Sequence, residues 1–159
     1  HNSEFVGNAG DGEFALDVYN VGTLWVNSTT FVENTGAIYF YSFSYRYYVA
    51  DIDITNSKFT RNTGTYTTRS QLHHFAGASP TYNYNTFIDN TGEAAISIFT
   101  KDSQSSLVRP QIFGNYFEDA DVTHEVECLL PTHSTAVNAS NNYWGTSESS
   151  QIQLRIFHN

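Results

Sequence analysis

Two acidic residues on one expected strand are the strongest candidates for chemistry. Asp51 and Asp53 are two residues apart, so on an extended strand both side chains point to the same face, with about 6.5–7 Å between their Cα atoms. Paired carboxylates can divide the acid and base roles of glycoside cleavage. Trp25, one repeat earlier, could stack on a sugar ring, and Arg109, two repeats later, could meet a charged group. These four residues define a candidate groove for a polysaccharide.

Charge and composition argue against catalysis in that groove. The chain has 7 basic and 16 acidic residues, a formal net charge of −9, and such a surface repels anionic polysaccharides, nucleic acids and anionic lipid heads. No histidine joins the expected column, and outward acids on a strand more often serve as solvated groups that prevent aggregation. We therefore expect no enzyme activity, no catalytic residue, no metal and no cofactor. A glycan that is bound or cleaved is the alternative.

Two other clusters contain atoms of the kind that bind metals. His124, Glu125, Glu127 and Cys128 lie close together in one segment, and His73 is followed by a second histidine. Neither spacing is typical of a particular ion, so we interpret both as surface loops. Cys128 is the single cysteine, and we expect a buried, inert thiol. The alternative is a disulfide to a cysteine outside this fragment.

The most unusual segment, residues 38–48, is dense in aromatic residues. Alternation along a strand places some of these rings on the outside, and outward aromatic rows are typical of contact surfaces. We predict an interaction surface here, formed by Tyr39, Tyr41, Tyr45 and Tyr47. The alternative is that the rings pack beneath a loop.

A repeat positions all of these residues. The pattern Phe-x-x-Asn-x-Gly begins at Phe5 and recurs from residues 31, 59 and 87, with degraded copies at 117 and 144, so the spacings are 26, 28, 28, 30 and 27 residues. Before each anchor, apolar residues alternate with mostly polar ones, as in Ile52-Asp53-Ile54, which is typical of a half-buried strand. A unit of this kind buries little by itself and has to stack on its neighbours.

These patterns predict an all-β fold, a right-handed single-stranded parallel β-helix (a solenoid) of about six coils. Each strand should pair in parallel with its equivalent one turn away, and helices should be scarce. We expect residues 1–159 to form a single domain of this type, a fragment of a larger extracellular protein.

The recurring residues then have structural roles. The aromatic anchors should stack inside the tube, and these are Phe5, Phe31, Phe59, Phe87, Phe117 and Trp144. The repeated asparagines should form an internal hydrogen-bonded ladder and adopt the left-handed conformation at a sharp corner; these are Asn8, Asn34, Asn62 and Asn90. The glycine two residues after each asparagine allows a positive φ.

The repeat resembles the coils of right-handed parallel β-helix proteins generally. Residues 137–147, with the run Asn-Asn-Tyr-Trp-Gly, and the later Arg155-Ile156-Phe157 are similar to the coil-closing segment of the bark beetle (Anakonda) proteins of animals. The resemblance implies a large cell-surface protein with extracellular β-helix modules that organises tricellular junctions, where three epithelial cells meet. Because stacked coils hold surface side chains at a regular spacing, we expect a rigid adhesion scaffold with protein partners. The open end of a solenoid also favours contact with the next domain or a second copy, and membrane attachment is expected only through a segment outside this fragment.

Two sequons bear on the compartment, Asn27-Ser28-Thr29 and Asn138-Ala139-Ser140. Both asparagines have outward parity in the expected strands, so we predict glycosylation at Asn27 and Asn138. A chain this rich in Asn, Ser and Thr contains about three sequons by chance. The sequons are therefore compatible with secretion and do not establish it.

Overall fold

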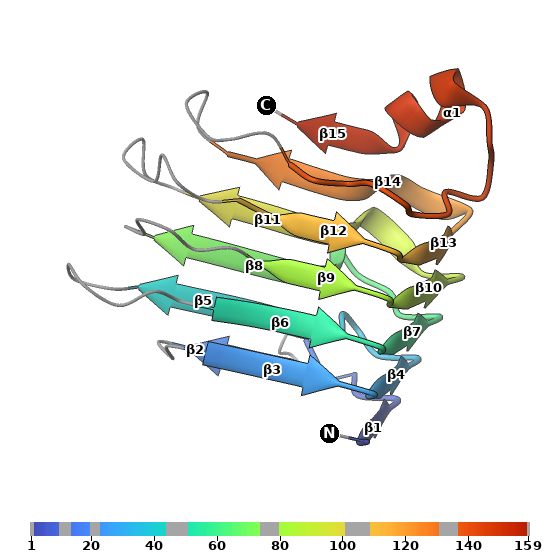
Figure 1. Cartoon of the computed structure of the whole chain (residues 1–159). Helices are drawn as coiled ribbons and strands as arrows, with labels where there is room; N and C mark the ends of the chain where they lie inside the picture. Colours follow the sequence, from blue (N-terminus) through green and yellow to red (C-terminus); the bar gives the residue numbers. More distant parts are fainter. Residues whose placement is uncertain are drawn as a thin grey trace.

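The computed structural model describes residues 2–9, 14–19, 23–43, 51–73, 80–100, 109–130 and 137–158. Within these ranges the chain forms three sheets whose strands all pair in parallel. Each strand lies beside its equivalent in the next repeat, so the coils stack along one axis, with the two ends of the chain at opposite ends of the stack (Figure 1). The predicted β-solenoid is confirmed.

Each sheet collects one strand per repeat. Sheet A contains β1 (Glu4–Val6), β4 (Thr30–Val32), β7 (Lys58–Thr60), β10 (Thr86–Ile88) and β13 (Tyr116–Glu118). Sheet B contains β2 (Leu16–Tyr19), β5 (Ile38–Phe43), β8 (Tyr66–His73), β11 (Thr91–Thr100), β14 (Asp121–Leu129) and β15 (Ile156–His158). Sheet C contains β3 (Thr23–Asn27), β6 (Asp51–Thr55), β9 (Thr81–Asn83) and β12 (Gln111–Phe113).

A complete turn takes one strand from each sheet in the order C, A, B. The first runs through β3, β4 and β5, and the last through β12, β13 and β14, which makes about four turns. The expected number of about six coils is too high because the outermost anchors lie in incomplete turns. Phe5 lies on β1, ahead of the described strands of sheet C, and Trp144 lies outside the strands.

A column of stacked aromatic rings runs through the interior beside sheet A. From Phe5 to Trp144 the successive ring centroids are 4.8, 5.1, 4.7, 5.1 and 5.0 Å apart, and no pair of ring planes is tilted by more than 17°. The four central rings are fully buried. The column therefore makes continuous contact from one end of the stack to the other.

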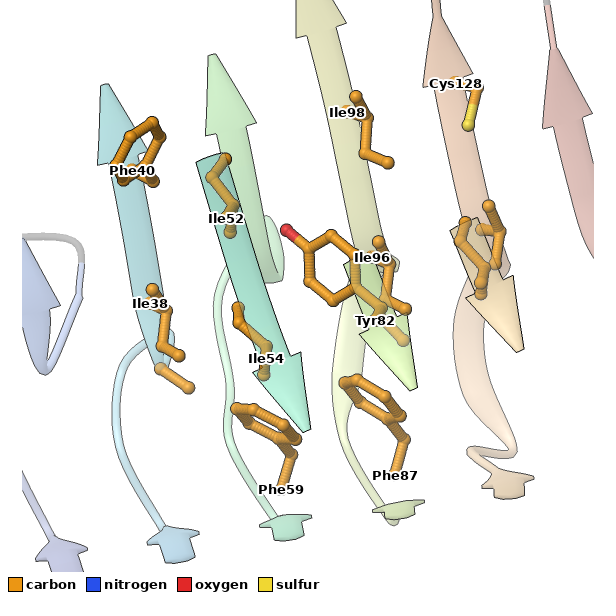
Figure 2. Packing of buried hydrophobic residues seen from close by; sticks show 14 of the residues in the cluster. Ile38, Phe40, Ile52, Ile54, Phe59, Tyr82, Phe87, Ile96, Ile98 and Cys128 are labelled. Atoms are coloured by element: carbon orange, nitrogen blue, oxygen red, sulfur yellow. The ribbon is translucent and has the colours of Figure 1, made fainter. Parts of the chain in front are cut away.

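The rest of the core lies between sheets B and C. Figure 2 shows Ile54, Tyr82 and Ile96 in this space, and all three are fully buried. The Tyr82 hydroxyl lies 2.6 Å from Ser70 Oγ, so the two sheets are also joined by a buried hydrogen bond. Trp25, between two inward residues of β3, is 67% exposed. The alternation predicted for these strands is therefore present.

The corner between sheets A and B contains an asparagine ladder. Asn8 Nδ2 donates to Asn34 Oδ1 at 2.8 Å, and the same bond is repeated at 2.9 Å from Asn34 to Asn62 and from Asn62 to Asn90. Asn90 then donates to Oδ1 of Asp119 at 3.0 Å. In every step the main-chain N–H of the donor residue binds the same oxygen. An aspartate thus continues the ladder where the sequence repeat is degraded.

The left-handed conformation is adopted by other residues than predicted. Positive φ occurs one position before each ladder asparagine, at Gly7, Glu33, Arg61 and Asp89. The prediction for the asparagines is wrong because their side chains point inward to the next coil, and the preceding residue makes the corner. The predicted positive φ is found at Gly36, Gly64 and Gly92, whereas Gly10 lies outside the described residues.

A second ladder occupies the corner between sheets C and A. Asn85 Nδ2 donates to Asn115 Oδ1 at 3.1 Å, and Asn115 Nδ2 donates to Asn142 Oδ1 at 3.0 Å. Ser57 and Thr29 continue this column toward the N-terminus through main-chain bonds. All five residues lie two positions before an anchor, so the position recurs although the residue type changes.

The two ends of the stack differ. At the C-terminal end Trp144 stacks on Phe117, and α1 (Ser149–Leu154) leads into β15, which pairs with β14 (Figure 1). At the N-terminal end Phe5, Leu16 and Leu24 are only partly buried and line a depression of about 130 Å³. Among the described residues, no helix has the length and apolar character that a membrane span requires.

Candidate functional site

Three tyrosines form a cluster on the outer side of sheet B, which we call the tyrosine face: Tyr19 on β2, and Tyr39 and Tyr41 on β5. Tyr19 is paired with Tyr41 across the two strands, and its ring centroid lies 5.8 Å from the rings of both Tyr39 and Tyr41. The alternate residues of β5, Ile38 and Phe40, are buried in the core. Period-two alternation therefore turns the tyrosines outward, as expected.

The tyrosine face is held in place by its neighbours. The hydroxyl of Tyr39 donates to Gln71 Oε1 at 2.9 Å, and Phe14 stacks on the Tyr39 ring at 5.3 Å. Tyr19 is the most exposed of the three, at 55%. Rings that are already positioned lose little conformational freedom when a partner binds. The other two predicted members, Tyr45 and Tyr47, lie outside the described residues.

A guanidinium group lies beside the tyrosine face in the same sheet. Arg69 on β8 is paired with Tyr39, and its guanidinium carbon lies 4.6 Å from the ring centre of Tyr66 and 5.8 Å from that of Phe99. Both distances suit a cation–π contact. The outer side of sheet B therefore combines aromatic rings with one immobilised positive charge.

A shallow depression lies on the outer side of sheet C. It has a volume of about 260 Å³ and is lined by Trp25, Asn27, Asp53 and Thr55. Trp25 and Asp53 are paired across β3 and β6, and Asn27 Nδ2 donates to Thr55 Oγ1 at 2.8 Å. An exposed indole beside a carboxylate, an amide and a hydroxyl provides the stacking and hydrogen-bonding groups that recognise a sugar.

Among the described side chains, only two of the four residues of the candidate groove line this depression. Trp25 and Asp53 are brought together, but Arg109 is exposed ahead of β12 and does not line the depression. Asp51 lies on β6 with its main chain paired to Thr23, and its side chain lies outside the described part of the structure. The arrangement can bind a polar ligand, and the described residues provide no acid and base pair around it.

The candidate metal cluster around residue 125 is divided between the two sides of sheet B. Glu125 is fully buried and binds Arg155, whereas Glu127 faces outward and accepts a hydrogen bond from Ser97 at 2.9 Å. Among the described residues no three metal-ligating side chains converge.

Cys128 is buried, and burial, with a smaller effect of Glu127, raises the pKa of its thiol to about 12. His124 packs beside Phe157, and His73 is described only in its main chain.

The two sequons have different surroundings. Asn138 is exposed, and its Oδ1 accepts a hydrogen bond of 2.8 Å from the hydroxyl of Ser140. Asn27 is only partly exposed, beside Trp25 in the depression of sheet C, and the Thr29 hydroxyl donates to the Asn27 carbonyl oxygen at 3.1 Å. Asn138 therefore offers more room for a glycan than Asn27.

No family model, no curated protein and no solved structure matches this chain. The function has to be inferred from the outward faces of the solenoid.

Proposed function

We propose that this protein is a non-catalytic extracellular scaffold module that binds a protein partner through the tyrosine face. Its setting would be a cell-surface adhesion or junction-organising protein of the tricellular-junction type, which is what its C-terminal segment resembles. The observation that carries the proposal is the cluster of Tyr19, Tyr39 and Tyr41 on adjacent strands, held at mutual ring distances of 5.8–6.4 Å.

The chemistry of the tyrosine face suits a protein partner. Tyrosine is enriched in protein interfaces because it combines a large apolar ring with a hydroxyl, and it has few rotatable bonds to immobilise. The underlying sheet continues as a stack of parallel strands, so the rings are carried by a rigid body rather than by a loop. With a net charge of −9, the module favours a partner whose surface is neutral or basic.

Cell binding tests this proposal against its alternative. Fluorescent, multivalent protein is applied to epithelial cells that have been treated with protease, with glycosidases or with neither. We expect protease to abolish binding and glycosidases to leave it intact. The variant Tyr19→Ser/Tyr41→Ser should lose at least about tenfold in affinity, since two interface tyrosines commonly contribute more than 1 kcal/mol each. The variant Tyr143→Ser removes a tyrosine that is 48% exposed elsewhere and is the matched control. Equal binding by both variants, or no binding to untreated cells, contradicts the proposal.

The depression around Trp25 supports a second candidate function, binding of a neutral glycan. The specific observation is the 67% exposed indole beside Asp53. A glycan array detects such binding, and Trp25→Ala should abolish it, while a reducing-end release assay would show whether the glycan is also cleaved. Binding that survives Trp25→Ala removes this candidate.

A further inference from the structure

The last complete turn contains two buried acidic side chains that the repeat does not require. Asp119 takes the place of an asparagine in the first ladder and is 2% exposed, and Glu125 on β14 is fully buried. The residue of β11 in the same strand register as Glu125 is Ala95. The last complete turn thus places two carboxyl groups where the preceding turn has Asn90 and Ala95.

Asp119 and Glu125 each have one oxygen without a partner. Oδ1 of Asp119 accepts two hydrogen bonds from Asn90, and Oε1 of Glu125 accepts one from Arg155 Nη1 at 2.6 Å. The other oxygens, Asp119 Oδ2 and Glu125 Oε2, are buried, and neither has a hydrogen-bond partner among the described residues. A buried acceptor in this state is costly unless a proton completes the bond.

The asparagines of the earlier turns show what is missing at Asp119. In Asn34, Asn62 and Asn90, Nδ2 donates a second hydrogen bond to the main-chain oxygen of an anchor, for example from Asn62 to Phe31 at 3.1 Å and from Asn90 to Phe59 at 3.0 Å. In an aspartate that nitrogen is replaced by a second oxygen, which donates only when it is protonated. The ladder geometry therefore favours a protonated carboxyl group in this turn.

Charge balance points to the same state. The charged or titratable groups around the pair are Asp89, which precedes Asn90, and Arg155, which lies between α1 and β15. Burial raises the pKa of Asp119 to about 6, despite the hydrogen bonds from Asn90. Burial and the negative charge of Asp119 raise the pKa of Glu125 to about 8, despite the opposing effect of Arg155. One proton on the pair leaves one negative charge, which the guanidinium of Arg155 balances.

We propose that Asp119 and Glu125 share one proton in the folded protein and that this protonated pair, bound by Arg155, forms a pH-dependent latch that holds the C-terminal segment 144–158 against the last complete turn. Trp144 is anchored in the aromatic column, and Ile152 and Ile156 pack against the core. Beyond these apolar contacts, the attachments of α1 and β15 are few. Arg155 O accepts hydrogen bonds from the main-chain N–H groups of Glu125 and Val126 at 2.8 and 3.2 Å, β15 has three residues, and α1 has no buried residue. Loss of the shared proton leaves two adjacent buried negative charges against one positive charge, and the latch opens.

The direction of the pH dependence follows from linkage. A carboxyl group whose pKa is higher in the folded state than in the unfolded state binds its proton more tightly when folded. The resulting stability is present at acid pH and is lost as the pH rises through the folded-state values, here between about 6 and about 8. Because the two groups interact, the pair titrates as a unit.

Hydrogen exchange of the β15 amides between pH 6 and 9, corrected for the intrinsic rate, tests the latch. In the wild-type protein we expect protection of β15 to fall by up to about tenfold per pH unit between pH 6 and about 8 and to level off above that, while β7 and β10 stay protected. Asp119→Asn restores the ladder residue and removes one charge, so its β15 protection should depend less on pH than that of the wild type. Asp121→Asn, which removes an exposed carboxylate two residues away, should behave like the wild type.

Two outcomes would overturn the latch. One is wild-type protection of β15 that does not change between pH 6 and 9, and the other is Asp119→Asn with the same pH dependence as Asp121→Asn. If Asp119→Asn does not fold, Glu125→Gln carries the same expectation. Carboxyl ¹³C NMR of the wild-type protein needs no variant: we expect the Asp119 and Glu125 resonances to titrate together above pH 6, and complete ionisation of both by pH 5 contradicts the proposal.

Discussion

Shortening one ring of the aromatic column should weaken the whole domain. Phe59 is fully buried, and its ring lies 5.1 Å from that of Phe31 and 4.7 Å from that of Phe87. Replacing a buried phenylalanine by alanine costs about 3–5 kcal/mol, and the two lost stacking contacts place Phe59→Ala at the upper end of that range. The neighbouring coils cannot collapse into the gap because their main-chain ladders set the spacing between them.

Denaturant unfolding measures this loss, and the chain contains a matched control. Tyr143 stacks on Tyr116 at 4.6 Å with a 15° angle between the rings, but it is 48% exposed. Tyr143→Ala removes similar stacking without opening a cavity and should cost only about 0.5–1.5 kcal/mol. Phe5→Ala, at the partly buried end of the column, should fall between the two. Equal losses for Phe59→Ala and Tyr143→Ala would refute the account of the aromatic column.

Three more predictions concern the corners and the thiol. Asn62→Ala leaves the Phe31 carbonyl oxygen and the main-chain N–H of Asn34 without the partners they have now, so it should cost about 2–4 kcal/mol in denaturant unfolding. Gly92→Ala places a methyl group against the carbonyl oxygen of Gly64 at a φ of 140°, so it should abolish folding or lower Tm by more than about 10 °C in a thermal scan. Cys128, whose pKa is raised to about 12 by burial, should react with a thiol reagent at pH 8 only after denaturant is added; rapid reaction of the native protein would contradict its burial.

The sequence predicts the solenoid because the residues that recur in its repeat are the ones that point into the core. Phenylalanine at the anchors and asparagine three residues later occur at nearly constant spacing, and each type has one favourable place in a stacked coil. The second ladder was missed because its column changes from Thr29 to Ser57 before asparagine takes over at Asn85. Ser57, Asn85 and Asn115 each offer a side-chain oxygen to the main-chain N–H of the equivalent residue one turn earlier. A search for identical residues does not detect acceptors of different types.

The buried pair of Asp119 and Glu125 could not be predicted from the alternation of residues along the strand. Glu125 has the sequence pattern of a strand residue in an alternating, outward patch, yet a main-chain irregularity in which the N–H groups of both Glu125 and Val126 donate to Arg155 O turns it inward. The alternation of inward and outward side chains is interrupted at such a point, and the sequence carries no signal of the interruption. The outward tyrosines on β5 were predictable because Ile38 and Phe40 alternate with them without interruption.

Spin-label distances along sheet A test most directly whether equivalent residues of successive coils lie above one another. Lys58 on β7 and Tyr116 on β13 are both exposed, and each is paired with Thr86 on the strand between them. Labels at residues 58 and 116 in a Cys128→Ser background should give a main-chain separation of about 10 Å, two steps of about 4.8 Å. A separation above about 20 Å would show that the coils do not stack in this register, and both proposed surfaces would lose their support.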